Sequence, residues 1–328
     1  TFPGLADGFQ QAGEYATLGM PAYLNGVVGP HWRTYFLEAL ALKTPIPLLL
    51  LWILTLTVSL PKLPETGGAA RWAPPILTAV FFAAALASNL NIGVRHILPV
   101  YPLMAIGCGS LVPFITKLLP PRQRWVGLTT GLLGVWFVAE AFLIHPTYLS
   151  YFNQFAGGPS GGSRYLGDSN IDWGQDLKRL KQVMDKRGLK EVLLSYFGNT
   201  DPAFYGIRYQ LLPGMIYGST QRDRVVDPRQ EVIALATHNI LFPFHFSGDF
   251  AWLSERKPLD RAGYSIMLYD ITGDADAHRR LAAIYQANKM SGLASKECQK
   301  VVAIEASRTT ESGDRTAMKP DPCRPPAP

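Results

Sequence analysis

The chain has 328 residues, enough for about two domains, and 48% of them are apolar. The net charge of +6 does not indicate a nucleic-acid partner, because the basic residues gather at the edges of apolar runs and along one helix rather than in one patch. The sequence opens on Thr1 in a loop-like segment without a signal-peptide pattern, so we expect a fragment whose N-terminal part is missing.

Residues 1–42 mix aromatic and cationic side chains. Trp32, Tyr35 and Phe36 are of the types that settle at the headgroup level of a bilayer. The segment therefore predicts an extracytoplasmic loop with interfacial character.

Four long apolar runs follow, almost free of charged residues. About 20 apolar residues in a helix are long enough to cross a bilayer, so these runs predict four transmembrane helices within residues 43–144. The runs are Pro45–Leu60, Ala73–Leu90, Ile97–Thr116 and Trp125–Ile144.

The charges of the short loops predict the orientation. The loops at 61–72 and 117–124 are the more basic ones, which places them in the cytoplasm by the positive-inside rule. The N-terminal loop, the segment NIGVRH (91–96) and everything after residue 144 then share the opposite face of the membrane.

The composition changes after the fourth run. An aromatic and then Gly/Ser-rich stretch at 145–163 is typical of a linker. Residues 164–272 alternate between strand and helix patterns and predict a small soluble α/β domain with a largely parallel sheet. A C-terminal helix and extension at 273–307 precede a polar, proline-containing tail at 308–328 that we expect to be disordered.

The elements of the α/β domain follow from periodicity. Its one strongly amphipathic helix is predicted at Asp172–Arg187, with Gly188 as its stop. Strands are predicted at Arg164–Ile171, Glu191–Phe197, Glu231–His238 and Gly263–Ile271. The fold class predicted for the whole chain is a multi-span α-helical membrane region with four spans, followed by this soluble domain.

Cysteines and histidines indicate no metal site. Cys108 lies in an apolar run, as expected of a small buried hydrophobe. Cys298 and Cys323 could pair in an oxidising compartment, and the sequence leaves this open. His238 and His245 match no metal-binding spacing, so neither a metal nor a cofactor is predicted.

Cationic side chains at the outer membrane edge are the first candidates for a site. Arg95 and His96 lie between two predicted spans, and Lys43 precedes the first span on the same side. An arginine fork binds two phosphate oxygens at once, although an interfacial arginine that only reaches for water is the alternative. Glu140 in the fourth predicted span is a functional candidate or a helix cap.

The polar run GDSNIDWGQD (167–176) is the second candidate. Asp168, Asn170 and Asp172 have the spacing of calcium ligands, but Trp173 occupies the position where a calcium loop needs glycine. Asp172 and Gln175 predict a capping box at a helix start. Asp168, Asn170 and Trp173 belong to the acidic loop in which the predicted strand Arg164–Ile171 ends, at the sheet edge where α/β proteins bind ligands.

Three stretches resemble bacterial multi-span glycosyltransferases of the GT-C type: YLNGVVGPHWRTYFLEALALKTPIPLLLL, NIGVRHILPVYPLMAIGCGSL and HPTYLSYFNQFAGGPSGGSRYLGDSNIDWGQDLKRL. The group that they most resemble is family 39, the dolichyl-phosphate-mannose–protein mannosyltransferase-like proteins. LSYFGNTDPAFYGI and FAWLSERKPLDRAGYSIMLYDI are similar to the soluble domain of that group. The resemblance covers residues 20–272.

The resemblance implies transfer of a sugar from a polyprenyl-phosphate carrier to an acceptor on the outer face of the bacterial cytoplasmic membrane. The chain would be the C-terminal part of a multi-pass inner-membrane enzyme with an extracytoplasmic C-terminal domain. Its partners would be the polyprenyl-phosphate-linked sugar, membrane lipid and an acceptor that the sequence does not identify. The alternative is a non-catalytic, membrane-anchored module that binds a glycan or a protein.

Site residues follow from the same resemblance. The carrier phosphate would be bound by Arg95, Lys43 and His96. Contacts to the sugar or the acceptor are expected from Asp168, Asn170 and Trp173. The catalytic carboxylate of the family lies in an outer loop near its N-terminus, which this sequence does not contain, so no catalytic residue is named.

Overall fold

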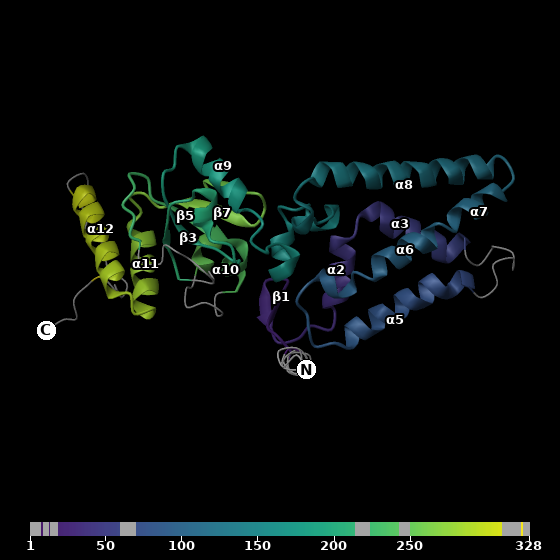
Figure 1. Ribbon diagram of the computed structural model, residues 1–328, viewed down its shortest axis with the longest axis horizontal. Helices are drawn as coiled ribbons and strands as arrows, with labels where there is room; N and C mark the ends of the chain where they lie inside the picture. Colours follow the sequence, from purple (N-terminus) through teal and green to yellow (C-terminus); the bar gives the residue numbers. More distant parts are fainter. Residues whose placement is uncertain are drawn as a thin grey trace. The chain divides into compact units, whose positions relative to one another are not determined.

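The computed structural model describes residues 8, 13, 19–59, 70–213, 224–242, 250–309 and 323. The chain forms two compact units, Thr1–Ile171 and Asp172–Pro328 (Figure 1). The division falls inside the GDSNIDWGQD run, whereas the sequence predicts the α/β domain from residue 164.

A small hairpin is the first element of the first unit. Strand β1 (Ala22–Leu24) pairs antiparallel with β2 (Val27–Gly29). Asn25 and Gly26 connect the strands with φ values of 51° and 89°. Both are in the left-handed region, which is the requirement for the tight turn of a two-residue hairpin. The segment predicted to be a loop therefore contains a hairpin.

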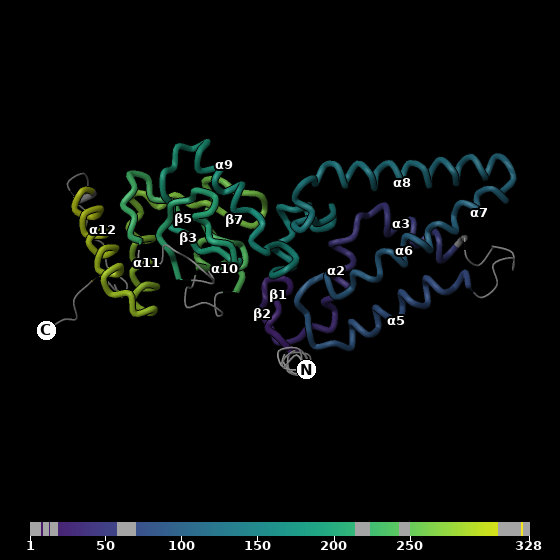
Figure 2. The backbone as a smooth tube through the Cα atoms, in the orientation of Figure 1, coloured from purple at the N-terminus to yellow at the C-terminus, as the bar shows by residue number. Residues whose placement is uncertain are grey.

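Helices make up most of the first unit. Figure 2 traces their backbones, and α5 packs against α6 while α3 packs against both α6 and α8. The helices are α2 (Tyr35–Lys43), α3 (Ile46–Leu54), a π-helical continuation η1 (Thr55–Ser59), α5 (Ala73–Ala87), α6 (Val100–Cys108), α7 (Leu111–Thr116) and α8 (Arg122–Ile144).

The predicted fold class with four membrane spans is wrong. Among the described residues, α8 alone is long and apolar enough to cross a membrane. A second candidate arises only if Tyr35–Lys43 and Ile46–Thr57, which meet at a bend of 106°, are counted as one span. Helices of this kind also occur in the cores of soluble proteins, so length and composition alone are weak evidence for a span.

The other apolar runs end for reasons that hydropathy does not register. Helix α5 ends because Ser88 is extended, with ψ at 141°. Helices α6 and α7 are separate, and Pro113 lacks the N–H that a continuous helix would need there. The apolar helical segments Ala70–Leu86 and Val100–Thr116 have at most 17 residues. Such a helix is about 26 Å long, against about 30 Å for the hydrocarbon core of a bilayer.

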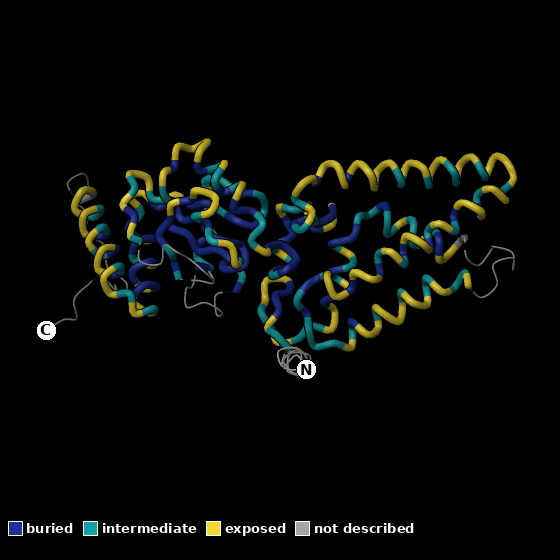
Figure 3. The backbone as a smooth tube through the Cα atoms, in the orientation of Figure 1, coloured by how far each residue is buried: buried dark blue, intermediate teal, exposed yellow. Residues whose placement is uncertain are grey.

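Helix α8 is exposed or half-buried along nearly all of its length (Figure 3), and many of its exposed residues are large and apolar. Leu132 is 60% exposed and Leu143 is 85% exposed. Only Glu140 and Ile144 of this helix are buried. A helix that is apolar on its exposed faces needs lipid or another protein to cover it.

Residues 145–171 fold into short turns rather than into a linker and a strand. The 3₁₀ segments of this region are η4 (Tyr148–Ser150), η5 (Gln154–Ala156), η6 (Gly162–Arg164) and η7 (Asp168–Asn170). Another 3₁₀ segment, η3 (Val94–Ile97), lies earlier in the chain, between α5 and α6. The predicted strand Arg164–Ile171 is wrong, and only Leu166 forms a bridge, to Leu24. A Cβ on Gly162 would lie 2.1 Å from the Phe152 ring, so glycine here permits close packing.

A five-stranded sheet forms the second unit, in the order β4-β3-β5-β7-β6. Its strands are β3 (Val192–Ser195), β4 (Tyr209–Leu211), β5 (Val232–Ala236), β6 (Asp260–Ala262) and β7 (Ile266–Asp270). Strand β3 is parallel to β4 and β5, but β7 is antiparallel to β5 and β6. The predicted largely parallel sheet is therefore wrong for half of the pairings. A short turn joins β6 to β7 as an antiparallel hairpin, and β7 also runs antiparallel to β5.

The helices of the second unit are α9 (Leu177–Arg187), α10 (Thr237–Leu241), α11 (Ala275–Ala287) and α12 (Ser291–Thr309), with 3₁₀ segments η8 (Pro202–Tyr205) and η9 (Ala251–Glu255). The predicted stop of α9 is confirmed, since Gly188 is left-handed with φ at 69°. Its predicted start at Asp172 is wrong. The Asp172 Oδ1 atom accepts from Gly174 N at 2.8 Å and Gln175 Oε1 accepts from Trp173 N at 2.8 Å, so these side chains stabilise a turn instead of a capping box.

Asp176 anchors the start of α9. Its buried carboxylate accepts hydrogen bonds from Ser265 Oγ at 2.8 Å and from the backbone N–H groups of Tyr264 and Ser265 at 3.3 Å. A Cβ on Gly263, whose φ is 60°, would lie 2.2 Å from Asp176 Oδ2. Glycine in the β6–β7 turn thus admits the carboxylate that links this turn to α9.

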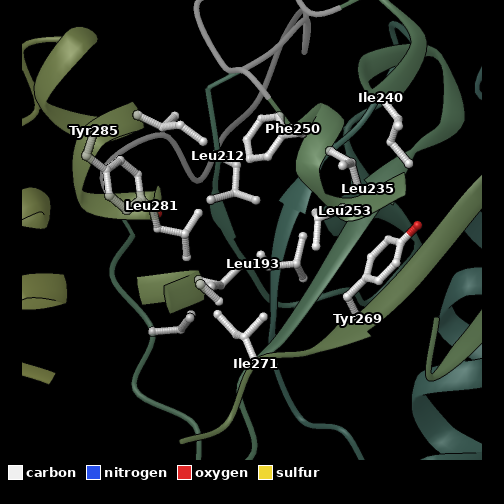
Figure 4. Packing of buried hydrophobic residues seen from close by; sticks show 14 of the residues in the cluster. Leu193, Leu212, Leu235, Ile240, Phe250, Leu253, Tyr269, Ile271, Leu281 and Tyr285 are labelled. Carbon is white, nitrogen blue, oxygen red and sulfur yellow. The ribbon is translucent and has the colours of Figure 1, made fainter. Parts of the chain in front are cut away.

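Alternate residues of the central strands face two apolar cores. Leu194 and Val232 belong to a core with Leu180 of α9. Leu193 and Ile271 belong to the other core, which α11 completes; Figure 4 shows the labelled side chains that meet there. Burial on both faces explains why β3 and β5 are continuously apolar.

A buried ionic cluster holds α12 against α11, and a disulfide joins α12 to Cys323. Cys298 pairs with Cys323 in a disulfide, with a Cα–Cα distance of 5.0 Å. His278 of α11 is fully buried; its Nδ1 lies 2.5 Å from Glu297 Oε2 and its Nε2 lies 3.2 Å from Glu231 Oε2. Lys300 contacts both carboxylates, at 3.2 Å from Glu297. Two cations and two carboxylates therefore neutralise one another between β5, α11 and α12.

The pH dependence of stability should report this cluster. Burial opposes protonation of His278, but the neighbouring carboxylates of Glu231 and Glu297 outweigh it and raise the pKa to about 9. A raised pKa stabilises the folded state below the unfolded value of 6.5, and this stabilisation is lost as the pH rises through 9. Relative to His278→Gln, the wild-type free energy of unfolding should fall by about 3 kcal/mol between pH 6.5 and pH 9.

Comparison of the two proteins at each pH, by chemical denaturation, isolates this histidine from other titrating groups. A difference in unfolding free energy that stays constant across this pH range would contradict the assignment.

Candidate functional site

Asn170, the last residue of η7, connects three segments of the first unit. It is fully buried. Its Nδ2 donates to Tyr35 Oη at 2.8 Å and to Gly167 O at 2.9 Å, and its Oδ1 accepts from Val94 N at 3.0 Å. One side chain thus joins α2, the segment NIGVRH and its own loop.

Lys43, at the end of α2, lies beneath the same loop. Its Nζ donates to Asn170 O at 2.6 Å and to Leu149 O at 2.7 Å, and it lies 4.4 Å from the centroid of the Phe152 ring. Burial lowers the pKa of this ammonium to about 7. Direct phosphate binding by Lys43 would require these contacts to break, so that role stays a prediction.

Ser169 brings the loop into close contact with the segment before η3. Its Oγ donates to Ile92 O. Gly93 has φ at 133°, and a Cβ there would lie 2.0 Å from Ser169 Oγ. Only glycine admits both this backbone conformation and this approach.

Arg95 and His96 lie on the exposed side of η3. The pKa of the nearby Tyr35 hydroxyl responds to these charges. Burial raises this pKa, and the hydrogen bond to Asn170 lowers it. The charge of Asp168 raises the pKa further, whereas the charge of Arg95 lowers it. Partial burial and the charge of Arg95 lower the pKa of His96, so its ring is neutral at pH 7. Opposite charges at Arg95 and Asp168 therefore lie around the Tyr35 hydroxyl.

Asp168 opens η7 with φ at 52° and is half-buried. Aspartate is among the few residue types besides glycine that adopt this left-handed conformation readily. The sharp turn lets Ser169 and Asn170 face the interior while Asp168 keeps access to solvent.

Trp173 belongs to the second unit, whereas the other five predicted contacts belong to the first. Its side chain is 51% exposed and its ring lies 5.7 Å from that of Phe197. Phe197 stacks on His238 at 4.1 Å, and His238 stacks on Phe242 at 4.6 Å. These four rings form one continuous row at the carboxyl ends of β3 and β5.

Metal binding has no support in the described part of the chain, where no group of three or more His, Cys, Asp or Glu side chains could hold an ion. His245 lies outside the described residues.

Glu140 has a structural role in this arrangement. Tyr151 Oη donates to its Oε2 at 2.5 Å, and Gln154 Nε2 donates to its Oε1 at 2.7 Å. The carboxylate links the end of α8 to the turns that follow it. Both contacts are to side chains and not to the backbone of a helix, so they differ from the predicted helix cap.

Two residues that hold the site were not among the site candidates named from the sequence. Tyr35 has the aromatic type expected at headgroup level, yet it is 1% exposed. Asn153 donates from Nδ2 to Ala41 O at 2.6 Å and to Thr44 O at 2.8 Å, which satisfies carbonyls at the end of α2. The sequence offered one signal for Asn153, which is that a lone asparagine lies within the aromatic stretch YFNQF.

Comparisons of the chain with protein-family models, with curated proteins and with solved structures gave no match.

Replacing Asn170 tests whether its side chain holds η3. Asn170→Ala removes three hydrogen bonds of about 1 kcal/mol each, so the first unit should lose about 3 kcal/mol of stability. The amide of Val94 should also exchange hydrogen faster in native-state measurements.

Asn288→Ala is the control, since that asparagine lies in the second unit, where its Nδ2 donates to Ile284 O at 2.8 Å. The assignment fails if Asn170→Ala leaves the protection of Val94 unchanged.

Proposed function

We propose that the chain is the C-terminal part of a membrane glycosyltransferase, which transfers a sugar from a polyprenyl-phosphate carrier to an acceptor on the outer face of the bacterial cytoplasmic membrane. The meeting of NIGVRH with the loop at 167–170 carries this proposal. Both segments belong to the resemblance to family 39 glycosyltransferases, and Asn170 and Ser169 join them across more than 70 residues.

Arg95 is the phosphate ligand in this proposal, and His96 assists it. Both are exposed on η3, whereas Lys43 is buried under the loop. The guanidinium can bind two phosphate oxygens, and the neutral imidazole can donate one N–H. Lys43 then supports the site from below by holding Asn170.

Asp168 is suited to a different task. A carboxylate repels the carrier phosphate but accepts hydrogen bonds from hydroxyl groups. Its position near Tyr35, together with Arg95, favours contact with a hydroxyl of the sugar or the acceptor.

Helix α8 is the segment of the chain with the strongest support for contact with the membrane. The helix has 23 residues, which span about 35 Å, and its exposed surface is apolar. The disulfide Cys298–Cys323 favours an oxidising compartment for the second unit, as the outer face of the cytoplasmic membrane provides in bacteria.

Arg95→Ala tests the phosphate site. Losing a charge-assisted contact worth about 1.5–3 kcal/mol should raise the Kd for farnesyl phosphate about 10- to 100-fold, measured by calorimetry in detergent micelles. Arg95→Lys should keep part of the affinity, because the charge remains but the fork is lost.

Arg124→Ala, an exposed arginine at the start of α8, is the control and should bind normally. Unchanged affinity in Arg95→Ala would exclude this phosphate site. Carrier binding without sugar transfer by the full-length protein would favour the non-catalytic binding module.

The location of the second unit is tested by thiol labelling in intact cells. A membrane-impermeant maleimide should label Cys298 and Cys323 only after treatment with an impermeant reductant, because the pair is oxidised and faces outward. Labelling that requires permeabilised cells would place the second unit in the cytoplasm.

A further inference from the structure

A shallow, open cleft of about 560 Å³ lies on the surface of the first unit and has no role in the site described above. Its volume is within the range of about 300–1,000 Å³ typical of ligand sites. The walls come from the β1–β2 turn, from α2 and from the end of η6. They are formed by Asn25, Glu38, Ala41, Leu42, Arg164 and Tyr165.

Backbone contacts hold the walls in place. Asn25 N donates to Tyr165 O at 2.9 Å, and Leu24 bridges to Leu166. The left-handed Asn25 turns the hairpin toward α2, where its Nδ2 donates to Glu38 Oε2 at 2.7 Å. The hairpin turn is therefore attached to both other walls.

The polar groups of the cleft still have hydrogen-bonding capacity. Within the described residues, Glu38 makes only the contact to Asn25, which leaves Oε1 available as an acceptor. The Arg164 guanidinium makes no hydrogen bond or ion pair in the same part of the chain, and its side chain is exposed. Asn25 and Tyr165 add an amide oxygen and a hydroxyl.

This combination suits a neutral ligand with several hydroxyl groups. A carboxylate accepts from hydroxyls, and a guanidinium donates to two neighbouring oxygens. Their charges cancel, so neither an anion nor a cation gains a net attraction. Leu42 and Ala41 provide apolar surface for the C–H face of a ring. We propose that this cleft binds the pyranose ring of a sugar.

The inference deepens the proposed function and rests on it for the origin of the sugar, either on the carrier or on the acceptor. Glu38 lies three residues after Tyr35 on α2, which is about 5 Å along the helix axis. Tyr35 bonds to the loop that holds η3. The sugar cleft and the Arg95 site therefore border the same helix.

Saturation-transfer NMR on the full chain in detergent micelles tests the cleft. The probes are methyl glucopyranoside, methyl mannopyranoside and methyl galactopyranoside, which carry no phosphate. At least one should bind, and Glu38→Gln and Arg164→Ala should each weaken its binding about tenfold, as expected for a lost hydrogen bond to a charged group.

Glu255→Gln and Arg124→Ala, two exposed positions outside the cleft, are the matched controls. Saturation transfer from none of the three glycosides, or binding that neither cleft variant weakens, overturns the proposal. Circular dichroism confirms that Glu38→Gln and Arg164→Ala are folded, and their unchanged affinity for farnesyl phosphate shows that the first unit is intact.

Arg95→Ala separates the two proposals. If it abolishes binding of farnesyl phosphate but not of the glycoside, both sites stand. If it changes neither while Glu38→Gln weakens glycoside binding, the carrier site fails and the sugar cleft stands.

Discussion

The buried amide of Asn170 is the contact on which the first unit depends. Buried polar groups are costly without partners, and here the end of α2 places a lysine and several carbonyls in the interior. Asn170 satisfies Tyr35 and Val94 with its side chain, and its own carbonyl accepts from Lys43. Asn153 satisfies the carbonyls of Ala41 and Thr44 in the same way. A network in which every member has a partner specifies one arrangement of these distant segments.

The same network gives different environments to Lys43 and Arg95, two cations that are equivalent by their position in the sequence. Lys43 and Arg95 each border an apolar run, but Lys43 is 8% exposed and Arg95 is exposed. Burial and two carbonyl contacts make Lys43 part of the scaffold, whereas η3 presents Arg95 to solvent. The distinction gives Lys43 a supporting role and leaves Arg95 at the surface as the candidate ligand-binding residue, which neither spacing nor residue type can establish.

In the second unit, ionic and covalent contacts stabilise elements that the apolar core holds only in part. Helix α12 has Val301 and Ala294 as its buried apolar residues. Glu297 and Lys300 of this helix complete the buried cluster around His278, and Cys298 adds the disulfide. A helix with so small an apolar face depends on the ionic cluster for its position, whereas the disulfide joins the helix to Cys323, which follows it in the chain.

The sequence by itself determined the features that rest on local chemistry. Neighbouring residues were enough to predict the apolar alternation and continuity of β3 and β5. They were also enough to predict the stop of α9 at Gly188 and the polar character of the 167–176 run. Arg95, His96, Asp168 and Asn170 could be named as candidates for the same reason. Short strands such as β4 and β6 were missed because three residues show no periodicity.

Only the tertiary structure decided what depends on contacts between distant residues. Hydropathy measures apolar content and not where a helix ends, so four apolar runs did not become four spans. The roles of Lys43, Tyr35 and Asn153 depend on carbonyls and hydroxyls more than 100 residues away. The Glu38 cleft likewise exists only because a hairpin turn and the end of η6 meet beside α2.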